Sequence, residues 1–500
     1  MNTEKNNSLE NLTVIELCSG IGAQMKGINN THLFNANMIA IADLDKEVVV
    51  SYAAIHCGLT TDMIENYADY PSKEMMVKEL TDKRLGYDFK KDKPYDWQKL
   101  SRRKDKTKGI EKYWLADYLS HNLGDMMQIE SLPYSDLLTY STPCTDLSIA
   151  GKQEGLKWTC QDCECEYNPS ELDVDTRYTC PNCGGHNIKS TRSGLLYEVE
   201  RLLVTAKENN TLPKYLLMEN VDALISKKYI DSFKDWIARL DNLGYNSYYQ
   251  TINAKNTGIP QNRNRIFCIS IRKDIDTKLF TFPKPFDTGI RLKDLLETDK
   301  DVLEKYFLSD EVQQRLQITD PTFEKNVIGT TKPEFRTIGQ RDLVYKEGSI
   351  MGALVATDYK QPKQIFADSN NIKRLFNIYG EDKGTGFAGN VWDKEYISPT
   401  ITTCQGGNRQ PMIEEDKHNF RMVRKLTPKE AHRLMGFDDI DYERCKAVGM
   451  SDSQGYKQSG NSIVTTVISL LAEHLYKAQY DNTYVCTDEK MINFQKSQAD

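Results

Sequence analysis

Short apolar runs alternate with helical patterns over the first half of the chain. An apolar run at residues 12–18 precedes a helical pattern at 23–28, and a second run at 36–42 precedes another at 46–56. Strands and helices that alternate at this spacing are typical of an α/β domain with a parallel sheet and helices on both faces. We therefore predict a doubly wound α/β domain at the start of the chain.

The same rhythm returns later, with strands expected at 135–140, 215–218 and 266–271. It is lost over residues 272–420, where Gly, Thr, Asn and Pro are frequent and irregular loops are expected. A helix start then returns at Thr427-Pro-Lys-Glu430, which has the spacing of a capping box with proline at the first helical position. The pattern predicts a separate domain over 272–420.

The composition is that of a globular protein. The chain has 500 residues, 39% of them hydrophobic and 27% charged, which excludes collagen-like and wholly disordered classes and suggests roughly three domains at about 150 residues each. No apolar run approaches the roughly 18–20 residues of a membrane helix, and the N-terminus lacks the features of a signal peptide. We expect a cytoplasmic protein.

Charge is unevenly distributed. The net charge of −7 excludes a uniformly basic nucleic-acid-coating protein. Residues 81–112 nevertheless carry twelve Lys or Arg against six acids, a net of +6, interleaved with Tyr87, Phe89, Tyr95 and Trp97. Two interpretations stay open: a solvated insertion, or an auxiliary contact in which cations meet phosphates and aromatic rings stack.

The twelve cysteines include one cluster. Cys160-x2-Cys163 and Cys180-x2-Cys183 have the spacing of a zinc ribbon, a closed tetrahedral site of four thiolates. Cys165 is a spare thiol in this cluster, and His186 is an alternative ligand. The sequence therefore predicts a structural Zn²⁺ site.

A glycine turn follows the first strand, and an acid ends the second. Backbone at Gly20 and Gly22 can approach a ligand closely, while Asp43 can accept hydrogen bonds from two ribose hydroxyls. The third glycine of the dinucleotide fingerprint is missing, so NAD is disfavoured and other adenosyl ligands remain. The alternative interpretation is a tight turn without a ligand.

Two reactive side chains are expected at the same edge of the sheet. Cys144, in Ser141-Thr-Pro-Cys144, follows one strand, and Glu219 follows the next. A thiolate there can act as a nucleophile and a carboxyl group as a proton donor in one pocket. An inert buried thiol is the alternative for Cys144.

Six motifs together resemble one family. In chain order they are Ile15-Glu-Leu-Cys-Ser-Gly-Ile-Gly22, Pro143-Cys144, Glu219-Asn-Val221, Gln261-Asn-Arg-Asn-Arg265, Arg424-Lys-Leu-Thr-Pro-Lys-Glu-Ala-His-Arg-Leu-Met-Gly-Phe437 and Gln458-Ser-Gly-Asn-Ser462. This order resembles that of the DNA (cytosine-5) methyltransferases of bacteria and phages. The resemblance implies methylation of cytosine C5 in duplex DNA with S-adenosylmethionine, through base flipping and a covalent intermediate between Cys144 and C6.

The resemblance also implies residue roles. Glu219 would hold or protonate cytosine N3, Arg265 would contact the flipped base, and Arg263 would support the same loop. The implied cofactor-binding residues are Cys18, Gly20, Ile21, Gly22, Asp43, Leu44, Asp125, Met126, Pro143, Asn461 and Ser462. Among these, Asp43 is expected on the ribose and Asp125 on the adenine amino group. Cys18 and Leu44 depart from the family, which often has Phe at the first position and a larger apolar residue that packs on adenine at the second.

The resemblance implies a Rossmann-like, S-adenosylmethionine-dependent methyltransferase fold with two lobes. The catalytic domain would span 1–271, carry the basic insertion at about 64–121 and the zinc ribbon at about 156–191, and be completed by 421–500. Two roles stay open for the ribbon: folding alone, or contact with DNA beside the flipped base. A smaller, irregular target-recognition domain would span 272–420. Candidate base- and phosphate-contacting residues in it are Arg336, Gln340, Arg341, Gln405, Asn408, Arg409 and Gln410.

The expected partner is double-stranded DNA, read at a short specific sequence in restriction-modification or by an orphan or phage protective methylase. A monomer without membrane contact is expected, with a cognate restriction endonuclease as a candidate partner. One alternative is a transfer-RNA cytosine methyltransferase, which shares the chemistry; the roughly 150 residues between Arg265 and Arg424 favour duplex DNA. The other is a catalytically silent DNA-binding module.

Overall fold

The computed structural model describes most of the chain between residues 9 and 485. The described ranges are 9–89, 91–141, 158–174, 176–189, 195–298, 302–306, 317–318, 327–330, 343–346, 349–354, 363–368, 374–377, 390–393, 412–414 and 421–485.

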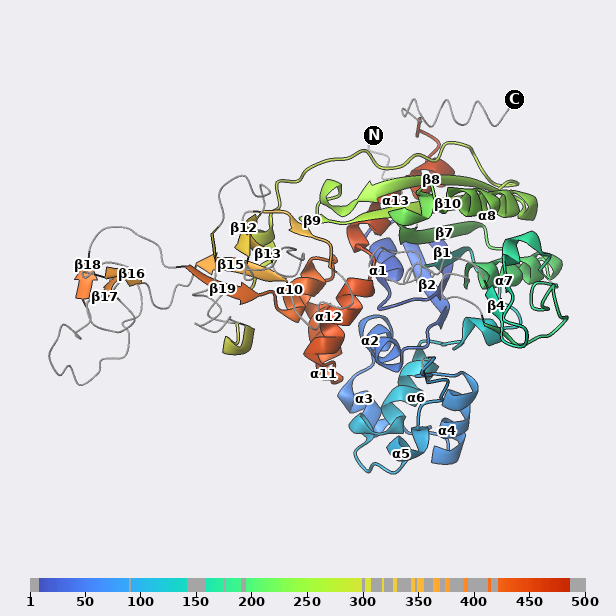
Figure 1. Ribbon diagram of the computed structural model, residues 1–500, viewed down its shortest axis with the longest axis horizontal. Coiled ribbons are helices and arrows are strands. Elements are labelled where there is room, and N and C mark those ends of the chain that lie inside the picture. The colour runs from blue at the N-terminus through green and yellow to red at the C-terminus, as the bar shows by residue number, and fades with distance from the viewer. Residues whose placement is uncertain are drawn as a thin grey trace, which may run out of the picture.

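A six-stranded mixed sheet forms the centre of the larger lobe (Figure 1). Its strands lie in the order β2-β1-β3-β7-β10-β8, and β10 runs antiparallel to both of its neighbours while the β2-β1-β3-β7 part is parallel. The strands are β1 (Glu10–Leu17), β2 (Phe34–Ala42), β3 (Leu137–Tyr140), β7 (Tyr215–Val221), β8 (Tyr245–Asn253) and β10 (Asn264–Arg272). The predicted α/β domain is confirmed.

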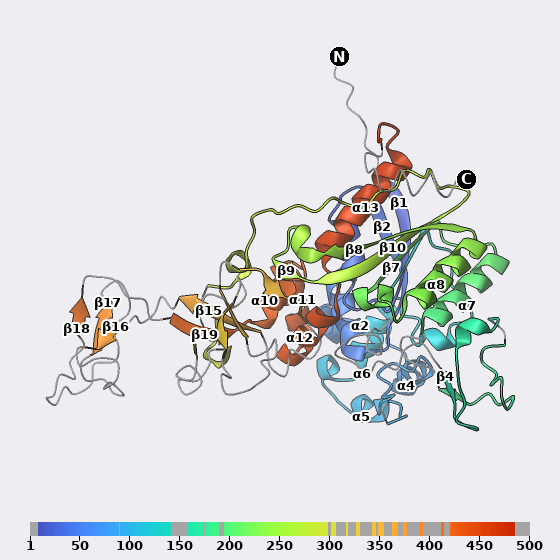
Figure 2. The same cartoon turned by 45° about the horizontal axis from the view of Figure 1, so that its top comes forward.

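Helices cover both faces of this sheet (Figures 1 and 2). One hydrophobic cluster joins β1 to α1 (Ala23–Asn29) and α13 (Thr465–Tyr480), and a second joins the other face to α7 (Leu196–Glu208) and α8 (Ile230–Leu243). The contact between α1 and α13 is close: a Cβ added at Gly27 would lie 2.5 Å from Ile468 Cβ. The end of the chain therefore packs on its beginning.

A helical insertion lies between β2 and β3. After α2 (Lys46–His56) come α3 (Thr61–Asn66), α4 (Lys73–Asp82), α5 (Trp97–Ser101) and α6 (Ile110–Leu119). Trp97 is only 2% exposed and belongs with Trp114 to a separate apolar core. This part of the chain projects below the sheet in Figure 1 and has a core of its own.

Short strands make up most of the described parts of the smaller lobe from residue 317 onward, at the left of Figure 1. A five-stranded sheet has the order β11-β12-β13-β15-β19, with β11 (Gln317–Ile318), β12 (Val327–Thr330), β13 (Leu343–Lys346), β15 (Gln364–Asp368) and β19 (Arg421–Lys425). A second sheet has β16 (Arg374–Asn377), β17 (Asn390–Asp393) and β18 (Met412–Glu414), and β9 (Gln261–Asn262) pairs with β14 (Met351–Gly352). The sequence predicted loops here, because strands of two to five residues show little periodicity.

The chain returns to the larger lobe through three helices, α10 (Pro428–Arg433), α11 (Asp439–Ala447) and α12 (Asp452–Asn461). The capping box predicted at Thr427 and Glu430 is present, and Glu430 also pairs with the fully buried Arg424 at 2.8 Å. Within the described ranges, none of the helices is both long and apolar enough to span a bilayer.

The cysteine-rich segment forms a small three-stranded sheet beside α7. Its strands are β4 (Trp158–Cys160), β5 (Glu166–Tyr167) and β6 (Ile188–Lys189), in the order β5-β4-β6. Trp158, which is 1% exposed, packs against Tyr197 of α7 and so anchors this segment to the larger lobe.

Candidate active site and metal centre

The turn after β1 has the backbone that the glycine motif predicted. Cys18, Gly20 and Gly22 all have positive φ angles, of 53°, 55° and 77°. A Cβ at Gly22 would lie 2.2 Å from Nε2 of His56, so glycine is required there by both space and conformation. Ile21, between the glycines, is buried, and its carbonyl oxygen lies 3.0 Å from the same His56 nitrogen.

Asp43 joins the end of β2 to this turn. Its Oδ2 accepts a hydrogen bond from Gly20 N at 3.0 Å, and its Oδ1 accepts one from Asp45 N at 2.9 Å. Burial raises the pKa of Asp43 from 3.8 to about 6, although the two backbone donors oppose this effect. A carboxylate retains further lone pairs, so Asp43 can still accept hydrogen bonds from a ligand.

Asp125 and Met126 lie next to Asp43. Asn122 links them, since its Oδ1 accepts hydrogen bonds from Asp43 N at 3.0 Å and from Gly124 N at 3.2 Å. Asp125 Oδ1 accepts a hydrogen bond from Met127 N at 3.1 Å, while its Oδ2 accepts one from Arg84 at 2.9 Å. The two acids that the resemblance assigns to ribose and adenine are thus held side by side.

A buried polar cluster supports the turn from beneath. Glu16, in the middle of β1, accepts hydrogen bonds from Met25 N and from the Tyr52 hydroxyl. Its complete burial raises its pKa from 4.5 to about 7, and burial lowers the pKa of His56 to about 4. Sequence reasoning missed this cluster, although an acid inside an apolar strand was a signal for it.

Glu219 and Arg265 form an ion pair across β7 and β10. Arg265 pairs with Val221 in the strand register and Glu219 with Phe267, which places both charged side chains on one face. Arg265 Nε lies 3.0 Å from Glu219 Oε1, and the side chains are 18% and 10% exposed. The carboxylate lies inside β7, which runs three residues further than the sequence predicted.

Arg263 ties this edge of the sheet to the C-terminal segment. It is buried and donates hydrogen bonds to the carbonyl oxygens of Ser462 at 2.7 Å, Gly460 at 3.3 Å and Leu354 at 2.7 Å. Ser462 is buried and Asn461 is exposed. Close by, Gln458 of α12 donates a hydrogen bond to the carbonyl oxygen of Glu47 in α2, just after Asp43.

Pro143 and Cys144 lie outside the described residues, as do the seven candidate DNA-contacting residues between 336 and 410. The last described residue before them is Ser141, whose Oγ lies 3.4 Å from Gln24 Nε2 in α1. Because β3 lies between β1 and β7, the chain leaves the end of β3 at a point between the glycine turn and the strand that carries Glu219.

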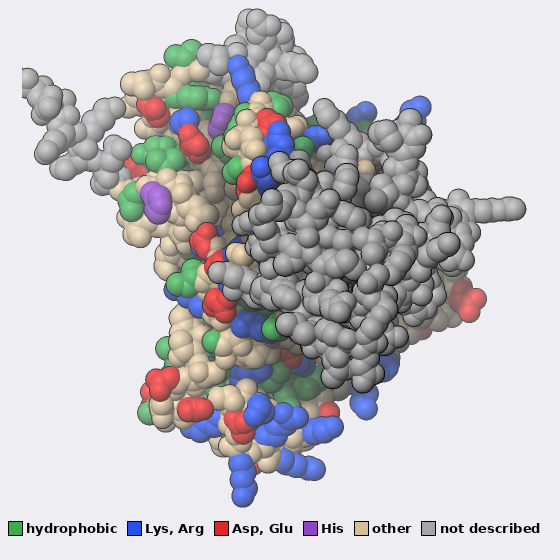
Figure 3. Space-filling model, turned by 90° about the vertical axis from the view of Figure 1, so that its left-hand side faces the viewer, with side chains coloured by type: hydrophobic (Ala, Val, Ile, Leu, Met, Phe, Trp, Pro, Cys, Tyr) green, Lys and Arg blue, Asp and Glu red, His purple; other side chains and the backbone are tan. Residues whose placement is uncertain are grey.

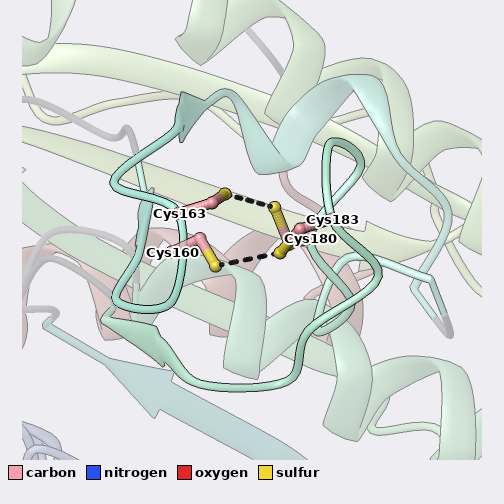
Figure 4. Close-up of side chains that lie close together, drawn as sticks. All are labelled: Cys160, Cys163, Cys180 and Cys183. Atoms are coloured by element: carbon pink, nitrogen blue, oxygen red, sulfur yellow. Dashed lines mark hydrogen bonds between the residues drawn. The ribbon is translucent and has the colours of Figure 1, made fainter.

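The four predicted zinc ligands come together (Figure 4). Sγ of Cys160 lies 3.6 Å from that of Cys183, the distance from Cys163 to Cys180 is also 3.6 Å, and all four sulfurs lie within 4.8 Å of one another. Tetrahedral zinc with Zn–S bonds of about 2.3 Å requires sulfurs about 3.8 Å apart. The arrangement fits such a site.

Backbone and side-chain donors surround these sulfurs. Asn182 donates from its backbone to Cys180 and from its side chain to Cys163, and Gly185 N donates to Cys183. Such donors favour thiolates. His186 Nδ1 lies 3.3 Å from the Thr179 hydroxyl; within the parts of the chain that the structure describes, the metal-ligand cluster contains neither His186 nor Cys165.

Buried ion pairs attach the cysteine-rich segment to α7. Arg177, fully buried, lies 2.7 Å from Glu200, and the Tyr178 hydroxyl donates to Glu198. Glu198 in turn holds Arg201, which donates to the carbonyl oxygens of Met126 at 3.3 Å and Ile129 at 2.8 Å. The segment is therefore connected, through α7, to the neighbourhood of Asp125.

Some residues of the basic stretch at 81–112 are buried or form ion pairs within the protein. Trp97 is buried, Lys83 pairs with Asp117 at 2.5 Å, and Arg84 pairs with Asp125. Other cations remain on the surface, and Figure 3 shows Lys and Arg side chains gathered at the lower end of the molecule, over the helical insertion. The exposed ones include Lys91, Lys93, Lys99, Arg102, Arg103, Lys104 and Lys108.

The mixed sheet carries the glycine turn with its neighbouring acids and the Glu219–Arg265 pair. The model of the family C-5 cytosine-specific DNA methylase matches residues 101–163 and 183–477. The chain belongs to this family and is a DNA (cytosine-5) methyltransferase. The match leaves out residues 164–182, the middle part of the cysteine-rich segment.

Several curated proteins are similar over most of their length. The type II methyltransferase M2.ScrFI of Lactococcus lactis subsp. cremoris is 28% identical, over 94% of this chain and 100% of that protein. The orphan methyltransferase M.SssI of Spiroplasma monobiae is 28% identical, over 94% and 98%. The orphan methyltransferase M.SPBetaI of Bacillus phage SPbeta is 27% identical, over 73% and 90%.

Proposed function

We propose that this enzyme methylates C5 of cytosine in duplex DNA with S-adenosylmethionine, through a covalent bond between Cys144 and C6 of a flipped base. The single observation that carries the proposal is the Glu219–Arg265 pair at the end of the central sheet. This pair provides a carboxyl group and a guanidinium at the edge of the sheet where β3 ends and the chain continues toward Cys144.

The residues around the glycine turn suit an adenosyl ligand. A Cβ built at Gly20 would meet nothing within 4 Å, so the backbone there is open to a close approach by a ligand. Asp43 has acceptor capacity for ribose hydroxyls, and Asp125 has it for an amino group. Cys18 is a poor nucleophile here, because burial raises the pKa of its thiol to about 12. When bound, S-adenosylmethionine supplies an electrophilic methyl group.

The proposed route begins with the Cys144 thiolate, which adds to C6 as the C5–C6 double bond opens. Glu219 hydrogen-bonds N3 and offers it a proton, so that negative charge does not build up on the ring. C5 then attacks the methyl carbon, the methyl–sulfur bond breaks so that S-adenosylhomocysteine leaves, and the N3 proton returns to Glu219. Loss of the C5 proton to a base returns the electrons to the C5–C6 bond and expels the Cys144 thiolate.

Arg265 would orient the base beside Glu219, and Arg263 would hold the segment around Asn461 and Ser462 against the site through its contacts with the carbonyl oxygens of Gly460 and Ser462. C6 is inaccessible inside a stacked duplex, so the target base must be flipped, at a cost of a few kcal/mol. The exposed cations of the helical insertion could contact phosphates and offset part of that cost.

We assign a structural Zn²⁺ to Cys160, Cys163, Cys180 and Cys183, because a closed set of four thiolates leaves no open coordination position for a substrate. Target recognition of a short DNA sequence would reside in the smaller lobe. The names of M2.ScrFI and M.SssI favour two roles, within a type II restriction-modification system or as an orphan enzyme. We expect a monomer that acts where its DNA substrate lies, in the cytoplasm.

Transfer of a labelled methyl group tests this function directly. The enzyme is incubated with methyl-labelled S-adenosylmethionine and either duplex DNA or transfer RNA. We expect label in 5-methylcytosine of DNA, located by bisulfite sequencing. Label in RNA alone would favour the transfer-RNA class, and DNA binding without transfer would favour a silent binding module.

A further inference from the structure

The helical insertion reaches the cofactor site through the turn at residues 83–86, and we propose that Arg84 in this turn is a positioning residue for the adenine group. In this account, which rests on the proposed function, Arg84 holds the Asp125 carboxylate as the acceptor for the adenine amino group. The sequence assigned Arg84 only to a basic stretch, and the family resemblance gives it no role.

The turn contacts both residues expected at adenine. Gly86 N donates to the carbonyl oxygen of Leu44 at 2.7 Å, and Asp125 N donates to that of Lys83 at 3.1 Å. A Cβ at Gly124 would lie 2.5 Å from the Lys83 carbonyl oxygen, so the two segments are in direct backbone contact. The insertion therefore fixes the backbone at both Leu44 and Asp125.

Arg84 acts on the Asp125 side chain itself. Its Nη1 lies 2.9 Å from Asp125 Oδ2, and the Asp125 side chain is only 3% exposed. A guanidinium has donors and no acceptor, so it can orient and neutralise a buried carboxylate without itself accepting a hydrogen bond from an amino group. Arg84 and Met127 N provide two hydrogen bonds to a group that can accept about four.

The surroundings hold Arg84 in place before any ligand binds. Its guanidinium carbon lies 4.0 Å from the ring centre of Tyr87 and 5.3 Å from that of Phe89. The backbone of Arg84 has φ 56°, in the left-handed region that a non-glycine residue adopts only when its neighbours impose it. A strained residue whose side chain is stacked and ion-paired is typical of a preorganised site.

The test uses two ligands that differ at one position of the purine. S-adenosylhomocysteine carries the 6-amino group, and S-inosylhomocysteine carries oxygen there, which cannot donate to Asp125. Calorimetry gives the dissociation constant of each for the full-length protein and for Arg84→Ala. The preference for the adenosyl ligand is the ratio of the two constants.

We expect Arg84→Ala to weaken S-adenosylhomocysteine binding by about tenfold or more, as for loss of one charge-assisted hydrogen bond. Binding of the inosyl ligand should change much less, so the preference falls. Arg84→Lys, which keeps the charge, should restore part of the preference. Gln98→Ala, an exposed change in the same insertion, should match wild type.

An unchanged preference in Arg84→Ala would overturn the inference, whether both affinities are retained or both fall equally, because a general structural effect does not distinguish the purines. If Arg84→Ala does not fold, Arg84→Lys decides: a preference for the adenosyl ligand that falls part of the way would support the role of Arg84, and an unchanged preference, with or without equal losses for both ligands, would contradict it. A wild-type protein that binds neither ligand would instead refute the proposed cofactor.

Discussion

Arg265 lies 3.0 Å from Glu219 across two antiparallel strands, so one ion pair spans the edge of the sheet where the base is proposed to bind. Glu219→Gln keeps the shape of the side chain and removes its acidity. We expect the single-turnover rate of methyl transfer to fall by roughly 10²-fold or more, the scale of general acid catalysis. Binding of S-adenosylhomocysteine should stay within about threefold, and a loss of cofactor binding without a loss of rate would contradict the assignment.

The glycine turn offers a matched pair of variants. Gly22 and Gly58 have similar φ angles, of 77° and 72°, but an added Cβ collides with His56 at Gly22 and meets nothing within 4 Å at Gly58. Gly58→Ala should cost about 1–2 kcal/mol, the penalty of a left-handed backbone. Gly22→Ala should cost more and weaken S-adenosylhomocysteine binding, as measured by urea unfolding and calorimetry. Equal unfolding free energies would contradict the packing described here.

Asp43 should make cofactor binding depend on pH. Burial raises its pKa to about 6, so it is mostly ionised at pH 7.5 and mostly protonated at pH 5. The charged form is the better acceptor for ribose hydroxyls. We expect the affinity for S-adenosylhomocysteine to fall as the pH falls through about 6, and Asp43→Asn to bind weakly with less dependence on pH. Wild-type affinity that rises toward pH 5 would refute this role.

Removal of zinc should loosen α7 as well as the cysteine cluster. Arg177 and Tyr178 lie just before Cys180 and pair with Glu200 and Glu198 of α7. We expect one Zn²⁺ per chain. After chelation, or in Cys163→Ser, backbone hydrogen exchange should become faster over residues 196–208 but not over α4. If hydrogen exchange became faster only in the cysteine-rich segment, the metal would stabilise that segment alone and this prediction would be wrong.

The parts of the fold predicted from sequence are those encoded locally. The alternating pattern gave the strands and helices of the central sheet, and the Thr427-Pro-Lys-Glu430 spacing gave a helix start, because a capping box involves four consecutive residues. The cysteine spacing likewise brought four sulfurs together, since each pair lies on one tight turn. In each case the signal lies within a few residues.

The remaining features depend on contacts that cross long stretches of chain. Charge counting could not show that Arg84 pairs with Asp125, 41 residues away, nor that Asn122 bridges to Asp43. Aromatic residues interleaved with charges left a solvated insertion and a stacking surface both open, and Trp97 is instead part of an apolar core. A side chain's partner is fixed by tertiary packing, which neither composition nor periodicity contains.

The covalent step is the central claim, and trapping tests it most directly. In a duplex with 5-fluorocytosine at the target, fluorine replaces the C5 hydrogen, and a base cannot remove it as it removes a proton. Methyl transfer therefore leaves the enzyme bonded to C6. With S-adenosylmethionine, we expect wild type to form an adduct that survives denaturing electrophoresis and Cys144→Ala to form none. Absence of an adduct with wild-type enzyme that methylates ordinary DNA, or an undiminished adduct with Cys144→Ala, would contradict the mechanism.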